Sequence, residues 1–177
     1  MNSFGPIQHF LSVFVMAFIG LIIGLAVIPS YFLFDWLTSL TQDQGSIYEA
    51  LGTCVGLGLG YILWGVSLIT ICGFLGGLFK IRKPEGRYPL RSFVTIQWAF
   101  SLVFHRSAQI FLKQVVPSFL ANLYYRMMGA KIGRGVQLNS ENINDASMLT
   151  FGDGVVVGGG ATINGHLVEK GEIILAP

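Results

Sequence analysis

Two long stretches without a charged residue constrain the fold of this chain more than any other feature. The first runs from Phe10 to Phe34 and the second from Ala50 to Phe79. Each is long enough to cross the hydrocarbon core of a bilayer, which needs roughly 20 apolar residues in a helix. Only 11% of the chain is charged, against about 25% in soluble domains. The sequence therefore predicts a two-span transmembrane hairpin within residues 1–91.

A cleaved signal peptide is the alternative interpretation of the first stretch. It is disfavoured because Met1–Gln8 contains no Lys or Arg, and because the apolar run is longer than the hydrophobic region of a signal peptide. We therefore expect a retained helix.

The charges beside the two stretches predict the orientation of the hairpin. Only acidic residues lie between the stretches, namely Asp35, Asp43 and Glu49. Five basic residues come soon after the second stretch: Lys80, Arg82, Lys83, Arg87 and Arg91. Lys and Arg near span ends favour the cytoplasmic side. We therefore expect a multi-pass protein of the inner (cytoplasmic) membrane, with the N-terminus and the C-terminal region both in the cytoplasm.

Glycines recur at intervals of four within both stretches. Gly52, Gly56 and Gly60 fall on one face of the second helix, and Gly20 and Gly24 fall on one face of the first. Small residues at this spacing let helices approach closely in lipid. The pattern indicates hairpin packing or an oligomer contact, and a Gly-rich span without a partner is the alternative.

Residues 92–129 are apolar but interrupted by charge. A third span would bury Arg106 near its centre, at a cost of about 2.5–3.5 kcal/mol. Amphipathic helices lying in the membrane interface fit better, with Trp98, Tyr124 and Tyr125 at headgroup level and a break at Pro117. The apolar face could form the floor of a tunnel for a lipid-like substrate, or it could only dock the next region against membrane lipids.

Residues 130–177 contain aliphatic or aromatic residues six apart, each with Gly or Asn as the next residue. Phe151, Val157 and Ile163 form this series, and Ile132-Gly133 has the same form. A six-residue period of this kind is typical of a hexapeptide β-helix, in which each hexad makes one short strand and one turn. The sequence predicts a short parallel β-helix with these residues inside, and a Gly-rich loop is the alternative.

His166 is the histidine of this predicted coil, at a turn that reads NGH. Imidazole titrates near neutral pH, which suits a general base in acyl transfer. Asn164 or the Gly165 amide could donate to an oxyanion, and Glu169 or Glu172 could orient the imidazole. An exposed turn histidine without a role is the alternative.

Other classes of site are not predicted. Asp145 is expected to help close a turn, and no carboxylate spacing matches a metal loop. Cys54 and Cys72 lack the spacing of a zinc site. No nucleotide-binding or protease motif is present, and the basic segment at residues 80–91 indicates topology and lipid contact, not nucleic acid.

The order of these segments resembles a known family. GRYPL precedes FLANLYYRMMGAKIGRGV, and DASMLTFGDGVVVGGGATINGH comes next. This order resembles the membrane-embedded C-terminal region of Pls/PosA-type peptide synthetases, the enzymes of the poly-lysine synthetase kind, and their free-standing relatives. More widely, it resembles the hexapeptide-repeat, LpxA-like acyltransferase superfamily. The similarity covers roughly residues 50–177.

The resemblance implies a left-handed parallel β-helix, a homotrimer, and transfer of an acyl or aminoacyl group from an acyl-CoA or acyl-carrier thioester, with no bound cofactor. Relatives continue beyond the position of Pro177 with more hexads, so a fragment, a coil capped by a partner chain and a loss of catalysis all stay open. Two functions are consistent with these features: a membrane-anchored acyltransferase-like enzyme, or a non-catalytic subunit of a larger membrane complex.

Overall fold

A computed structural model describes residues 4–80 and 85–176 of the chain. Arg82, Lys83 and Pro177, which the topology and coil predictions invoked, lie outside these residues. The chain divides into two compact units, Met1–Ile71 and Cys72–Pro177. Helix α2 runs across the division, so its last turns belong to the second unit.

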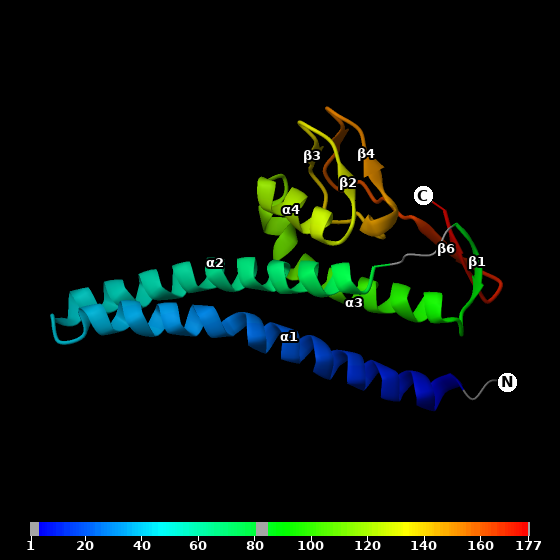
Figure 1. Cartoon of the computed structure of the whole chain (residues 1–177). Helices are drawn as coiled ribbons and strands as arrows, with labels where there is room; N and C mark the ends of the chain where they lie inside the picture. Colours follow the sequence, from blue (N-terminus) through cyan, green and yellow to red (C-terminus); the bar gives the residue numbers. More distant parts are fainter. Residues whose placement is uncertain (1–3, 81–84, 177) are drawn as a thin grey trace. The chain divides into compact units, whose positions relative to one another are not determined.

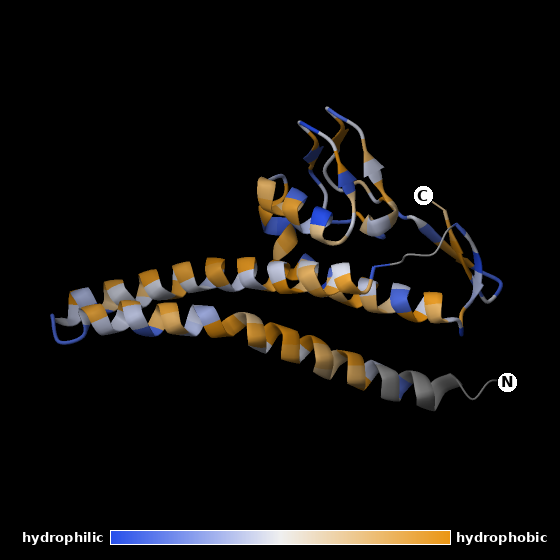
Figure 2. Ribbon diagram, in the orientation of Figure 1, coloured by the Kyte–Doolittle hydropathy of each residue, from blue (hydrophilic) through white to orange (hydrophobic). Residues whose placement is uncertain are grey.

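The first unit is formed by α1 (Phe4–Thr41) and the larger part of α2 (Ser46–Leu78) (Figure 1). Both helices are long and apolar enough to cross a membrane, and apolar residues cover most of their length (Figure 2). Many of their large apolar side chains are exposed, among them Phe14 and Leu57. The predicted pair of long apolar helices is confirmed, and the bounds of each helix differ by several residues from the uncharged stretch that predicted it.

The glycine face of α2 packs against α1. Gly52, Gly56 and Gly60 are buried. A Cβ added to Gly52 would collide with Thr41, and one added to Gly56 would come within 2.9 Å of the Phe34 ring. The glycines therefore act in hairpin packing, as one of the sequence alternatives predicted. Gly20 and Gly24 of α1 have nothing within reach of an added Cβ.

The second unit contains two more helices and several short strands. The helices are α3 (Phe93–Val115) and α4 (Phe119–Met127), with a short 3₁₀ helix, η1 (Ala146–Met148). Ser92 and Ser118 cap the two α-helices, because each side chain accepts a backbone N–H three residues ahead. The predicted break at Pro117 is confirmed, since it lies between the helices. The strands are β1 (Gly86–Pro89), β2 (Lys131–Ile132), β3 (Gln137–Leu138), β4 (Thr150–Phe151), β5 (Val156–Val157), β6 (His166–Glu169) and β7 (Glu172–Leu175).

The short strands of residues 131–163 pair in parallel. β2 pairs with β4, β3 pairs with β5, and an isolated bridge joins Ile143 to Ile163. Phe151 and Val157 are buried as the six-residue period predicts, whereas Ile163 is only partly buried. Tyr125 of α4 binds to the segment between β3 and the Ile143 bridge, because its hydroxyl donates to the Ser140 carbonyl.

The last strands form a different sheet. β7 lies between β1 and β6 and pairs antiparallel with both. Ile173 and Leu175 of β7 pack with Val94 of α3 in a buried cluster that Trp98 partly covers. Within the second unit, β1 contacts α3, whereas β2 and β3 contact α4. β6 begins at His166.

The predicted left-handed parallel β-helix is wrong. Among the described residues the parallel pairs are two-stranded and only two residues long, and four α-helices dominate the chain. The six-residue period predicts which side chains point inward, but it does not fix how long the pattern continues. The next position after Ile163 would be Glu169, a charged residue that a narrow apolar core would not hold. The chain turns into the β6–β7 hairpin at this point.

Two tyrosines within residues 92–129 are not located where the sequence predicted. Tyr124 and Tyr125 are fully buried instead of lying at headgroup level. Tyr124 fits closely beside α2, because Gly73 leaves space for its ring, and Gly76 leaves space for Met128. The tyrosines are therefore part of the protein core.

Candidate active site

The candidate site is centred on Asp145, the residue before η1. Its backbone is left-handed, with φ of 56°, a conformation that Asp and Asn adopt more readily than most residues. This local geometry turns the carboxylate back into the protein. Its side chain is only 4% exposed.

The Asp145 carboxylate accepts hydrogen bonds at both oxygens. Trp98 Nε1 of α3 donates to Oδ1 at 3.0 Å. The backbone N–H of Gly165 donates to Oδ2 at 2.9 Å, and His166 Nδ1 lies 2.5 Å from the same oxygen. Three groups from two other segments thus hold the carboxylate, which satisfies the hydrogen-bonding need of a buried acid.

This contact fixes the tautomer of His166. A carboxylate oxygen only accepts hydrogen bonds, so the Nδ1 atom beside it carries the proton. A neutral imidazole then presents Nε2 as a proton acceptor. The Trp98 ring packs edge-on against the imidazole, with centroids 4.7 Å apart, and limits its rotation. In its geometry, this contact is like the carboxylate–histidine pair of catalytic triads, where the carboxylate orients the imidazole.

The structure brings together only some of the residues predicted from sequence. Asn164 accepts a hydrogen bond at its side-chain oxygen from Asn144, at 2.7 Å, so its amide nitrogen is the group left to donate. The Gly165 N–H, suggested for an oxyanion, already donates to Asp145. Glu169 lies at the far end of β6 from His166 and pairs with Lys170, and Glu172 pairs with Arg87. The imidazole is therefore oriented by Asp145 and not by either glutamate.

A second histidine, His105, lines a small cavity together with Asp145. His105 of α3 is buried, with Nδ1 at 2.9 Å from the Tyr124 hydroxyl. Gln109 donates to the Glu141 carbonyl at 3.0 Å and lies 3.3 Å from His105 Nε2. Burial, and then the neighbouring Arg106, lower the pKa of His105 to about 4, although Asp145 acts in the opposite direction. The ring is thus neutral at physiological pH.

A small cavity lies between His105 and Asp145. It has a volume of about 10 Å³, and its lining includes both of these residues and Ser101. That volume is close to the minimum for one water molecule. It could hold a bridging water, but it could not hold a substrate.

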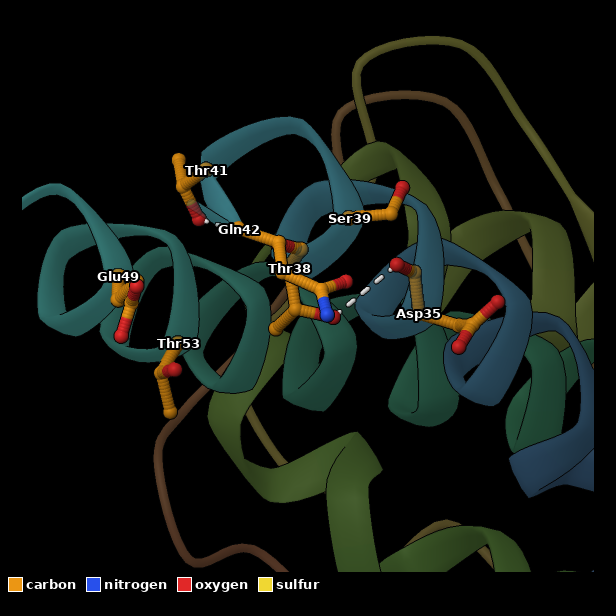
Figure 3. A pocket seen from close by; sticks show the side chains of 7 residues that line it. All are labelled: Asp35, Thr38, Ser39, Thr41, Gln42, Glu49 and Thr53. Carbon is orange, nitrogen blue, oxygen red and sulfur yellow. Dashed lines mark hydrogen bonds between the residues drawn. The ribbon is translucent and has the colours of Figure 1, made fainter. Parts of the chain in front are cut away.

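A larger hollow lies at the loop between α1 and α2 (Figure 3). It has a volume of about 230 Å³, and its lining includes two acids, Asp35 and Glu49. The hydroxyls of Thr38 and Thr41 are used within their own helix, because they donate to backbone carbonyls. The residues that line the hollow form no base–acid pair, so the Asp145–His166 pair is the better candidate.

One curated protein is similar to most of this chain. The delta-poly-L-ornithine synthetase of Acinetobacter baumannii (strain AB307-0294) is 28% identical over 145 residues. The match covers 82% of this chain but only 10% of that synthetase. No family model matches the chain, and no solved structure matches it. The similarity relates the chain to a peptide synthetase, in line with the resemblance to the poly-lysine synthetase kind, but it gives no evidence of a hexapeptide repeat.

Proposed function

We propose that the chain is a membrane-anchored transferase that moves an acyl or aminoacyl group from a thioester to an amine or hydroxyl. The observation that carries this proposal is the 2.5 Å contact between His166 Nδ1 and the buried Asp145 carboxylate. The contact leaves Nε2 as a base. The similarity to a peptide synthetase supports the same class of reaction, because peptide synthesis forms amide bonds by acyl transfer.

The reaction needs one proton to move twice. Nε2 of His166 takes a proton from the acceptor amine as its nitrogen attacks the thioester carbonyl carbon. The carbonyl becomes an oxyanion, to which the Asn164 amide could donate. The carbon–sulfur bond then breaks, the imidazolium returns the proton to the leaving thiolate, and an amide and a free thiol result. Acyl-CoA or an acyl-carrier thioester would serve as the donor, and no bound cofactor is required.

A non-catalytic subunit of a larger membrane complex is the second candidate. The observation that favours it is the size of the cavity beside Asp145, about 10 Å³, where substrate pockets usually enclose about 300–1,000 Å³. Under the first proposal, a neighbouring subunit of a homotrimer or of a larger complex would complete the substrate cleft. Under the second, the same surface would only bind that neighbour.

Thioester consumption by the full chain, purified in detergent, tests the transferase. A panel of acyl-CoA and aminoacyl-carrier donors is supplied with amine acceptors, and release of free thiol is measured. We expect turnover by the natural sequence and a loss of about 10²–10⁴-fold in both His166→Gln and Asp145→Asn, the usual contribution of a general base. Asn tolerates the left-handed backbone at position 145, so that variant removes the charge without straining the turn.

His9→Gln is the matched control, because His9 is exposed on α1 and is outside the site. It should retain full activity. Activity that persists in His166→Gln would exclude His166 as the base. If the natural sequence releases no thiol with any donor, the non-catalytic subunit becomes the better explanation.

A further inference from the structure

Helix α3 has a second apolar face that no other part of the described structure covers. Its inner face carries Val94 and Trp98, which pack in the core of the second unit. Phe93, Ile96 and Ile110 are exposed, Phe93 by 69%. A helix of a soluble domain has one apolar stripe towards its core and a polar surface opposite. α3 instead has apolar residues on both its buried and its exposed surfaces.

The exposed face continues from the end of α2. The last turns of α2 carry Phe74 and Leu78, which are both exposed. Phe79 comes directly after α2 and stacks on Phe100 of α3, with ring centroids 5.5 Å apart. α3 is therefore fixed beside the point where the apolar helix α2 ends, and the apolar surface passes from one helix to the other.

Basic side chains flank this face. Arg91 lies just before α3, and Arg106 and Lys113 lie along it, and all three are exposed. Exposed Lys and Arg beside an apolar face suit the anionic headgroups of a charged membrane surface. Charge and apolar exposure thus point to the same partner, a lipid surface.

We propose that α3 lies in the membrane interface, with Phe93 and Ile96 among the acyl chains and Arg106 and Lys113 at the headgroups. This inference rests on the membrane anchoring in the proposed function. It also places the candidate site, because Trp98 on the inner face of α3 donates to Asp145. A helix is about 10 Å across, so the Asp145–His166 pair would work at the bilayer surface, on acceptors that reach it there.

Spin-label accessibility in vesicles tests the position of α3. Cys54 and Cys72 are first replaced, and single cysteines are introduced at Phe93 or Ile96. The full chain is reconstituted in equal parts of phosphatidylcholine and phosphatidylglycerol. Ile62→Cys, exposed on α2, is the lipid-facing control, and Thr162→Cys, exposed before β6, is the aqueous control. We expect labels at Phe93 and Ile96 to collide with oxygen as the Ile62 label does, and to be shielded from a water-soluble nickel chelate.

Three results would overturn the inference. Labels at Phe93 and Ile96 that meet the nickel chelate as freely as the Thr162 label does would mean that α3 faces water. Labels that are shielded from both reagents would mean that a protein surface covers α3. In both cases an oxygen-accessible Ile62 would leave the anchor intact. A water-accessible Ile62 would instead refute the anchor itself, and the lipid docking of α3 with it.

Discussion

At the scale of single residues, His105 is a buried titratable group whose pKa is strongly shifted. It lies on α3 beside Tyr124 and Tyr125, with ring centroids 5.9 and 6.1 Å away. Its Nδ1 faces the Tyr124 hydroxyl and its Nε2 faces the Gln109 amide. The charged neighbours are Arg106 and Asp145, which act on its pKa in opposite directions. Burial dominates and keeps the imidazole neutral.

This burial predicts a loss of stability in mild acid. The pKa of His105 is about 4 in the folded protein, against about 6.5 in an unfolded chain. Between these two pH values, the imidazole of His105 is protonated in the unfolded state but not in the folded state. The free energy of unfolding should therefore fall as pH decreases from about 6.5 to 4, by about 3 kcal/mol from this group. Urea unfolding in detergent measures the free energy of unfolding across that pH range.

His105→Gln separates this effect from other titrations. Gln keeps a polar side chain of similar length towards Tyr124 but does not titrate. We expect the variant to be less stable at neutral pH and to have a flatter dependence on pH. Equal slopes for the variant and the natural sequence would show that His105 does not titrate between these values.

The residue scale also shows the limits of prediction from sequence. The sequence singled out His166 for its imidazole chemistry, and its role as a general base stays a prediction. Its expected place in a turn is wrong, because His166 is the first residue of β6. The sequence indicated only a turn former at Asp145 and an interfacial anchor at Trp98. In the structure both side chains contact the His166 ring. The three residues come from segments far apart in the chain, and no local spacing rule joins them. Only the packing of the 145 and 165 turns against α3 brings them together.

At the scale of elements, the glycines of α2 serve two different contacts. Gly52 and Gly56 admit side chains of α1. Further along, Gly76 and Gly77 admit the end of α4, and an added Cβ on Gly77 would collide with the backbone carbonyl oxygen of Met127. A side chain can move aside, but a carbonyl fixed in a helix cannot do so cheaply. Gly77 is therefore the most restrictive position of the series.

Gly77→Ala should destabilise the packing of α4 by about 1–3 kcal/mol, the usual cost of overpacking. Gly58→Ala is the matched control, because it is the same substitution in the same helix with nothing within 4 Å. It should be neutral or slightly stabilising, since Ala favours a helix by up to about 1 kcal/mol over Gly. Thermal unfolding in detergent compares the two. Similar melting temperatures would argue against the close approach of α2 and α4.

Element prediction succeeded where one physical rule decides the outcome. Long uncharged runs predict helices, because lipid leaves backbone groups no other partner, and Pro117 breaks a helix because it lacks an N–H. The hexads predicted that Phe151 and Val157 point inward. The β-helix failed because its length depends on the residues after Ile163. The β6–β7 hairpin, whose turn at Lys170 and Gly171 has positive φ, pairs with β1 from much earlier in the chain.

At the scale of the whole molecule, charge is distributed unevenly along the chain. All 11 Lys and Arg residues lie after Phe79, and the loop between α1 and α2 carries only acidic charge. Three acids, Asp35, Asp43 and Glu49, lie at that end of the hairpin. Such asymmetry is what orients membrane hairpins. The expected orientation therefore depends on where the charges lie in the sequence, and not on any contact in the fold.

We therefore predict that residues 35–49 face away from the cytoplasm and that both flanking ends lie within it. Single cysteines at Gln42 and at Glu85, both exposed, are introduced after Cys54 and Cys72 are replaced. In intact cells an impermeant thiol reagent should label Gln42→Cys and not Glu85→Cys, and the second should react once the membrane is permeabilised. The opposite pattern would mean that the hairpin is inverted. Labelling of both positions in intact cells would mean that α2 does not cross the membrane, because both of its ends would then be reached from outside.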